Sequence, residues 1–460
     1  MATAATTLHG NWHDDDFLSF GGADHDEDES YRAIVTKRPL PKQRQQASSP
    51  LPPWMTQPHE KPPGFRPINP MVALHNEIVD FCSLMEPRIS EIQIREALVI
   101  EISEIISAAF SKKEECSVNL FGSQATGLFL PSSDIDLVVM FKLFDEKNDP
   151  IKDDESEWRA EKQSPLFRVA EALKDAWRDK LSYLEVIEQT RVPLVKCTHK
   201  PSGVSIDICF NQQTGVKAAA LMTTFLKAMP PLRPLTFVLK YFTASRGLNE
   251  PYSGGIGSFL LQLLIVSFLQ HRERDAINFR RPSPYNLGCL LVEFCELYGM
   301  DFNFVTTAIS VRHDGYYFPK GAKDKREHFF QSTRPFSLAV ENPLDTTMDV
   351  GKPSFRIHLV QRTLDTAFKV LRSHVTVPII PSDSILKSIL PLTAEMWERR
   401  KMVMADGNED MWEGSTSDDD KEGLLTKRPL QKYNNDDMWG SDSDHDGEAQ
   451  PVNKKARNKY

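Results

Sequence analysis

The most constraining feature of the sequence is a pair of aspartates one residue apart at the start of an apolar run. Asp134 and Asp136 lie in "NLFGSQATGLFLPSSDIDLVVM", residues 119 to 140. The run DLVVM predicts a strand, and side chains two residues apart on a strand project from the same face. Carboxylates among apolar neighbours are costly to bury alone. We therefore expect either a solvated strand edge or a cation close to both carboxylates.

Two further features favour the cation. Gly122 and Ser123 precede the aspartates, and a glycine turn that enters a helix N-terminus presents backbone N–H groups and a hydroxyl to a phosphate. Asp207 in "VSIDICF" is a lone acid between apolar residues on a later predicted strand. Three carboxylates and a phosphate cradle suit phosphoryl or nucleotidyl transfer on two Mg²⁺ ions, with Mn²⁺ as the other candidate metal. The competing interpretation makes Asp134 a helix or turn cap and Asp207 a salt-bridged core acid.

The remaining pattern predicts an α+β protein with two parts. Residues 75–110 have helical periodicity, and strands and one helix follow up to about residue 215. From Gly215 onward the pattern is helical, with segments such as "GSFLLQLLIVSFLQHR". A mixed α/β unit of roughly 100 residues is therefore embedded in a mostly helical domain.

The excess negative charge of the chain lies near its two ends. The net charge is −9, and the acids concentrate in residues 14–29 and 405–450, which leaves the central part formally neutral. Residues 1–66 and 401–460 have a biased composition that predicts disordered tails. The six cysteines show no CxxC pair or zinc spacing and are expected to be reduced core residues. No apolar run is long enough for a membrane helix, so we expect a soluble intracellular protein.

The tails carry short repeated strings. "TKRPLPK" begins at Thr36 and "TKRPLQK" at Thr426, while "DMWEGS" at Asp410 recurs as "DMWGSD" at Asp437. A tryptophan in an acidic tail suits docking to a partner, although chance similarity in biased sequence is the alternative. The final "KKARNK" fits a nuclear import signal.

These motifs lead to a resemblance. "FGSxxTGLxLPxSDIDLVV" with a third acid in "SIDICF" resembles the DNA polymerase β-type nucleotidyltransferase superfamily. Over roughly residues 70 to 375 the chain is similar to the noncanonical poly(A) polymerases of the TRAMP type, which add adenylates to nuclear RNA 3′ ends and so mark them for the exosome. The resemblance implies a nucleotidyltransferase palm at 111–215, a helical central domain at 67–110 and 216–400, and ATP held between them.

The resemblance also implies roles for individual residues. Asp134, Asp136 and Asp207 would be the catalytic and metal-binding residues, and Asp207 would assist deprotonation of the RNA 3′ hydroxyl. The implied nucleotide contacts are Gly122, Ser123, Lys240 and Ser258 at the phosphates, Phe259 stacked on the adenine, and Glu341, Asn342, Asp345 and Asp349 at the base edge. From the residues alone, Lys240 could instead extend to solvent and Phe259 could be core.

Base choice would lie in the loop 337–355. Uridylyl-selective relatives carry a histidine where Met348 stands, which favours ATP here, and the family's usual acid before the loop proline is replaced by Asn342. Without the resemblance, "ENPLD" predicts only a turn with solvated acids.

The expected activity is template-independent adenylation of RNA 3′ ends. The chain shows no RNA-recognition module or zinc knuckle, so a partner that supplies RNA affinity is expected. By resemblance the partners are a zinc-knuckle RNA-binding protein, an RNA helicase that docks on a tail repeat, and the nuclear exosome. The alternatives are a uridylyltransferase, a CCA-adding enzyme or small-molecule adenylyltransferase, and a noncatalytic scaffold in an RNA decay complex.

Overall fold

The structure is a computed structural model that describes residues 69–110, 114–143, 164–190, 192–278, 286–321, 327–376 and 384–391. The predicted tails and their repeated motifs lie outside the described residues. Within the described ranges, no helix combines the length and the apolar character that crossing a membrane requires.

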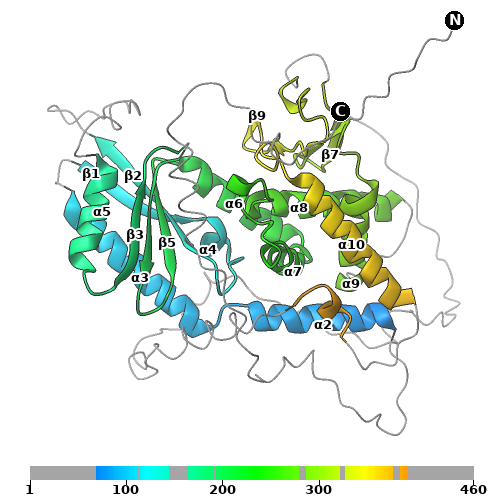
Figure 1. The fold of residues 1–460 in the computed structure, drawn as a ribbon, viewed down its shortest axis with the longest axis horizontal. Coiled ribbons are helices and arrows are strands. Elements are labelled where there is room, and N and C mark those ends of the chain that lie inside the picture. The colour runs from blue at the N-terminus through cyan, green and yellow to red at the C-terminus, as the bar shows by residue number, and fades with distance from the viewer. Residues whose placement is uncertain are drawn as a thin grey trace, which may run out of the picture. The chain divides into compact units, whose positions relative to one another are not determined.

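A five-stranded mixed sheet forms the α/β part (Figure 1). Its strands are β1 (Glu114–Phe121), β2 (Ile135–Leu143), β3 (Leu181–Ile187), β4 (Leu194–His199) and β5 (Ser205–Phe210). The spatial order is β1-β2-β5-β4-β3, with β2 and β5 parallel and the other neighbours antiparallel. This order brings β2 and β5 side by side although they are far apart in the chain.

Helices α3 (Ile89–Ala109) and α5 (Pro165–Ala176) pack on one face of this sheet (Figure 1). Alternate residues of the central strands, such as Ile135 and Leu137 of β2 and Ile206 of β5, are fully buried against these helices. Because strand side chains alternate, the residues between them project from the opposite face. That opposite face carries the acids predicted from the sequence.

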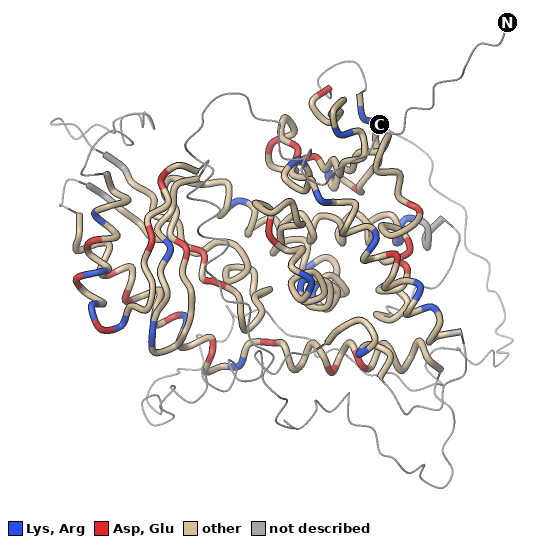
Figure 2. Tube along the Cα trace, viewed as in Figure 1, with Lys and Arg blue, Asp and Glu red and all other residues tan. Residues whose placement is uncertain are grey.

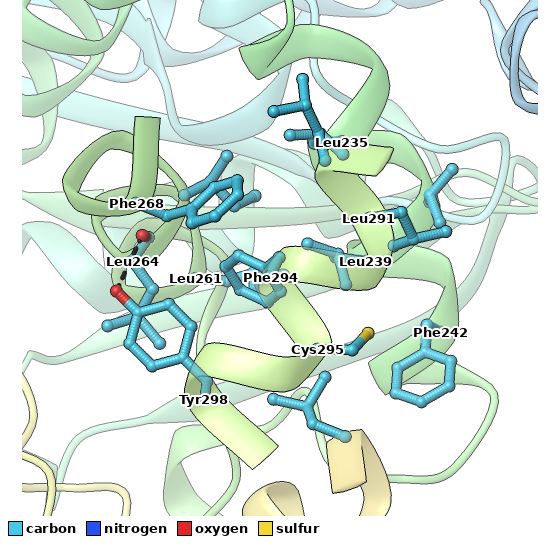
Figure 3. Packing of buried hydrophobic residues seen from close by; sticks show 14 of the residues in the cluster. Leu235, Leu239, Phe242, Leu261, Leu264, Phe268, Leu291, Phe294, Cys295 and Tyr298 are labelled. Atoms are coloured by element: carbon cyan, nitrogen blue, oxygen red, sulfur yellow. Dashed lines mark hydrogen bonds between the residues drawn. The ribbon is translucent and has the colours of Figure 1, made fainter. Parts of the chain in front are cut away.

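The helical part comprises α2 (Pro70–Met85), α6 (Gln213–Ala228), α7 (Leu232–Ala244), α8 (Ser258–Asn278), α9 (Leu287–Glu296) and α10 (Ile357–Thr376). Residues 258–270 of helix α8 are mostly apolar on every side and mostly buried, whereas the helix continues into the charged sequence HRERD. Figure 3 shows Phe294 and Tyr298 packed among leucines of α7 and α8, with the Tyr298 hydroxyl donating to the Leu264 carbonyl at 3.0 Å. The buried Tyr298 hydroxyl thus has a hydrogen-bond acceptor within an apolar core.

Small elements complete the helical part. They are the strand pairs β6 (Thr307–Ser310) with β7 (Tyr316–Pro319) and β8 (Glu341–Asn342) with β9 (Asp345–Asp349), the 3₁₀ turns η3 (Pro251–Ser253), η5 (Glu327–Phe329) and η6 (Leu386–Ser388), and the π turn η4 (Leu297–Asp301). The predicted loop 337–355 therefore contains the β8–β9 hairpin.

The structure divides the first predicted helical segment between the two cores. Buried residues of α2, such as Phe81, join the helical core, whereas Leu98, Ile102 and Ile106 of α3 join the core of the sheet. The sequence-based boundary at residue 110 treated both helices as central domain. Periodicity identifies a helix but does not say which core its apolar face meets.

Candidate nucleotidyl-transfer site

The three predicted aspartates meet on the face of the sheet opposite α3 and α5. Asp136 of β2 and Asp207 of β5 are directly paired in the parallel register, and Asp134 lies just before β2. The side chains of Asp134 and Asp207 are 38% and 26% exposed, so they are accessible from solvent. The β2–β5 pairing, which sequence spacing could not reveal, is what brings the third acid to the first two.

A lysine that the sequence analysis did not single out stands among these acids. Lys196 of β4 pairs in register with Asp207, and its Nζ donates to Asp134 Oδ2 at 3.3 Å and to Asp207 Oδ2 at 3.2 Å. The cation expected beside the aspartates is thus a lysine ammonium in this structure. Asp207 is salt-bridged, as the competing interpretation held, but its partner is shared with Asp134. A lone charge among apolar strand residues, in "RVPLVKC", was the available signal.

The electrostatics show an acid cluster that one lysine does not fully compensate. Burial, together with the nearby charges of Asp207 and Asp134, raises the pKa of Asp136 to about 6. Burial also raises the pKa of Asp207. Burial alone would lower the pKa of Lys196, but the two carboxylates raise it above its ordinary value. Such a cluster favours binding of further positive charge.

Gly122 allows the closest approach in the site. Its φ is +63°, in the left-handed region, and a Cβ placed there would lie 2.1 Å from Asp136 Oδ2. Gly122 and Ser123 begin the short helix α4 (Gly122–Thr126), directly after β1, as the sequence predicted. The glycine is thus required both by its backbone conformation and by the carboxylate beside it.

Lys240 of α7 reaches the segment between α4 and β2 and does not extend to solvent. Its Nζ donates to the Leu128 carbonyl and to Ser133 Oγ, both at 3.2 Å. Burial lowers the pKa of this ammonium to about 8, although Asp136 and Asp134 act in the opposite direction. A buried cation with two neutral acceptors is suited to take an anionic partner.

Arg95 of α3 is a second residue that the sequence analysis missed. It is 2% exposed and donates to Gln124 Oε1 at 3.3 Å, the Pro131 carbonyl at 3.4 Å and the Ser133 carbonyl at 2.7 Å. It therefore ties the helix of the Gly-Ser motif to the residue that precedes Asp134. Helical periodicity gave no signal, because a buried arginine occupies a position expected to be apolar.

Ser258 and Phe259 begin α8. Both are half-buried, and Phe259 packs against the helical core. The phenylalanine is thus partly core, as the residues alone suggested, and partly available for stacking.

The four predicted base-choice residues differ in burial and in hydrogen bonding. Glu341 is 3% exposed and is bound by Arg312 at 3.3 Å and the Tyr316 hydroxyl at 3.4 Å. Asn342 Oδ1 accepts from Leu344 N in a local turn, and Asp345 is exposed and accepts from Thr347. These contacts leave Asn342 and Asp345 nearer to solvent than Glu341.

Asp349 is one of the residues that line a cavity of about 420 Å³. Its Oδ1 accepts from Val340 N and Gly351 N, while Oδ2 is buried and receives no hydrogen bond from any described residue. The other lining residues are Pro251, Arg334, Lys352, Pro353 and Phe355. Met348 is half-buried beside it in the sequence. The cavity is in the size range of small-ligand pockets.

The chemistry of the aspartates fits a hard divalent cation, since Mg²⁺ and Mn²⁺ prefer oxygen ligands. The buried Asp207 Oδ1 lies 3.1 Å from the Lys196 ammonium yet receives no hydrogen bond from the described residues, so it retains ligand capacity. As they stand, however, no three His, Cys, Asp or Glu side chains of the described ranges form a metal cage. Asp136 lies beside Gly122, whereas Asp134 and Asp207 lie beside Lys196.

Comparisons with known proteins identify relatives of this chain. Residues 74–227 match the family model described as "Poly(A) RNA polymerase, mitochondrial-like, central palm domain", and residues 286–348 match "Cid1 family poly A polymerase". The chain is 34% identical over 300 residues to the Poly(A) RNA polymerase cid14 of Schizosaccharomyces pombe, which covers 65% of this chain and 40% of the relative. The chain spans less than half the length of the first curated relatives that it matches, from 37% to 47%.

A shorter relative is covered more fully. Trf4-2 of Drosophila melanogaster, named an inactive noncanonical poly(A) RNA polymerase, is 32% identical over 330 residues, which is 71% of this chain and 73% of the relative. Among solved structures, the polymerase core of TRAMP, an RNA surveillance complex, superposes with a TM-score of 0.59 at 29% identity over 70% of this chain and 95% of the other.

A structure of the Cid1 poly(U) polymerase superposes with a TM-score of 0.52 at 20% identity over 68% of this chain and 99% of the other, and shows the fold alone. From these matches and the palm geometry, the chain belongs to the noncanonical poly(A) polymerase family and has its polymerase β-like nucleotidyltransferase fold.

Proposed function

We propose that this protein is a template-independent RNA adenylyltransferase that transfers AMP from ATP to RNA 3′ hydroxyls. The observation that carries the proposal is the pairing of Asp136 and Asp207 on adjacent parallel strands, with Asp134 and Gly122 beside them. Relatives named poly(A) RNA polymerases, and the TRAMP polymerase core, support adenylate as the transferred group.

Residues of both the α/β part and the helical part would contribute to the proposed reaction. Asp134, Asp136 and Asp207 would hold two Mg²⁺ or Mn²⁺ ions. When bound, the ions would activate the 3′ hydroxyl and neutralise charge on the triphosphate. Lys240 would exchange its neutral acceptors, the Leu128 carbonyl and Ser133 Oγ, for a phosphate oxygen.

The other nucleotide contacts also come from both parts. Gly122 and Ser123 would present backbone N–H groups to the triphosphate, with Ser258 near it. Phe259 would stack on the base without reading its edge.

The test is primer extension on labelled oligoadenylate RNA with each of the four NTPs. Wild-type protein should give a ladder with ATP, and Asp134→Ala/Asp136→Ala protein should give none. A ladder of equal length from the double variant would contradict the assignment of the aspartates.

Uridylyl transfer is the second candidate, supported by the shared fold with Cid1 poly(U) polymerase. Met348 stands where the resemblance puts histidine in uridylyl-selective relatives, which favours ATP. Met348→His should therefore raise the ratio of kcat/KM for UTP to that for ATP, while Met300→His, on an exposed turn, should not change it. Extension of the wild type only with UTP would replace the adenylyl proposal.

A noncatalytic role in an RNA decay complex is the third candidate, because the well-covered Drosophila relative is named inactive. Family membership alone therefore does not decide activity. The three aspartates of this chain favour catalysis, and absence of extension with every nucleotide, with and without partners, would favour the scaffold.

We further propose that the protein works in the nucleus in a TRAMP-like assembly with a zinc-knuckle RNA-binding protein, an RNA helicase and the exosome. The likeness to the polymerase core of TRAMP, an RNA surveillance complex, supports an assembly of this kind, and the named partners and the nucleus follow from the resemblance alone. Basic and acidic residues are mixed along the described chain, which favours weak binding to RNA (Figure 2). Deleting residues 405–460 should abolish helicase co-purification. Nuclear fluorescence of the tagged chain should fall when the basic cluster at residues 454–459 is neutralised.

A further inference from the structure

The lysine at the acid cluster occupies an unusual position for a strand residue. Lys196 lies on β4, next to β5, and its side chain is 30% exposed. Its ammonium is 3.3 Å from Asp134 Oδ2 and 3.1 Å from Asp207 Oδ1. Asp134 precedes β2 and Asp207 lies on β5, so the ammonium bridges two acids that the fold brings together.

Lys240, the other lysine near the acid cluster, does not pair directly with Asp134 or Asp207. Lys240 is bonded to the Leu128 carbonyl and Ser133 Oγ, and it acts on Asp136 only at longer range. Among the described residues the direct charge partner of Asp134 and Asp207 is therefore Lys196. Without it, two half-buried carboxylates would face each other with no cation, which is costly.

We propose that the Lys196 ammonium is a built-in counter-ion that occupies the carboxylates while no divalent ion is bound and withdraws when one binds. This inference rests on the proposed two-ion function. The Lys196 ammonium lies against both Asp134 and Asp207, so it would repel a divalent cation bound to the same carboxylates, and the two compete for the site. A flexible four-carbon stem allows the ammonium to move away, which a buried arginine fork would not.

The consequence is a coupling that works in both directions. Lys196 stabilises the empty site and, to the same extent, weakens the first divalent ion. The site would thus bind metal poorly until a nucleotide brings its own charge and oxygen ligands. Lys196 is in this sense a positioning residue for metal loading.

The test measures Mn²⁺ binding to the full chain, without nucleotide or RNA, from the electron paramagnetic resonance signal of free Mn²⁺. Lys196→Met keeps the length and removes the charge, and should bind Mn²⁺ roughly tenfold more tightly than wild type. The matched control is Lys180→Met, which removes a lysine of the same α/β part that is paired with Glu101 at 2.8 Å. The control should bind Mn²⁺ as wild type does.

Thermal unfolding gives a second readout that does not depend on activity. Without metal, Lys196→Met should unfold at a lower temperature than wild type, and Mn²⁺ should raise its midpoint more. Lys196→Arg keeps the charge but is less able to withdraw, and should bind Mn²⁺ no more tightly than wild type.

Unchanged or weaker Mn²⁺ binding by Lys196→Met would overturn the proposal, and so would tighter binding by Lys196→Arg. If Lys196→Met does not fold, the Lys196→Arg comparison and Lys196→Gln decide, with the tighter binding expected for Gln. Loss of primer extension in wild type would leave these binding results intact, so the two proposals fail separately.

Discussion

Replacing Gly122 by alanine tests the close approach on which the site depends. The added Cβ would meet Asp136 Oδ2 at 2.1 Å, and the position has a φ of +63°. An ordinary contact between carbon and oxygen is about 1 Å longer, so the carboxylate must retreat by roughly that distance.

The magnitude has two parts. The left-handed conformation costs a residue with a Cβ about 1–2 kcal/mol. Displacing a reacting group by about 1 Å costs roughly 100-fold in rate. We therefore expect Gly122→Ala to lower the unfolding midpoint by a few degrees and to reduce kcat about 100-fold.

Gly203→Ala separates the two parts. Gly203 has nearly the same φ, +65°, but nothing lies within 4 Å of an added Cβ there. Both variants should lose stability in thermal unfolding, Gly122→Ala the more because of its added contact, and only Gly122→Ala should lose primer extension. Equal activity of the two variants would refute the argument that Asp136 is held against the glycine.

Three further perturbations have defined outcomes. Arg95→Met leaves the Pro131 and Ser133 carbonyls without their buried donor. It should lower the free energy of unfolding, measured with denaturant, by about 3 kcal/mol and should also lower kcat. An unchanged kcat would contradict the positioning role of Arg95. Burial raises the folded-state pKa of Asp136 from 3.8 to about 6, so the folded state binds a proton more tightly than the unfolded state. The resulting contribution of Asp136 to the free energy of unfolding is lost as pH rises from about 4 through 6. Asp136→Asn should flatten that decline in the metal-free protein, and identical pH profiles would count against it. Glu77→Ala removes the acceptor for the Leu386 amide at 2.7 Å and should lower the free energy of unfolding by about 3 kcal/mol. Primer extension should be retained below the unfolding transition. An unchanged thermal midpoint would show that the Glu77–Leu386 hydrogen bond is dispensable.

Sequence analysis reached the local features of the site. The alternation of "SDIDLVV" and "SIDICF" put the acids on one face of predicted strands. In the structure Asp136 and Asp207 lie on paired strands, whereas Asp134 lies just before β2. The residues that sequence analysis missed, Lys196 and Arg95, are charged positions within otherwise apolar patterns. Their partners lie 11 to 62 and 29 to 38 residues away, respectively, and spacing carries no information at that range.

The sequence by itself determined the strand and helix pattern, the turn at Gly122 and the candidate acids, because these depend on neighbours within a few residues. Only the tertiary structure decided that β2 lies beside β5, that α3 joins the core of the sheet while α2 joins the helical core, and that Glu341 is engaged by Arg312. It also brought Lys196 beside Asp134 and Asp207. Each of these depends on packing between segments far apart in the chain, where burial and charge pairing set the arrangement and no local pattern records it.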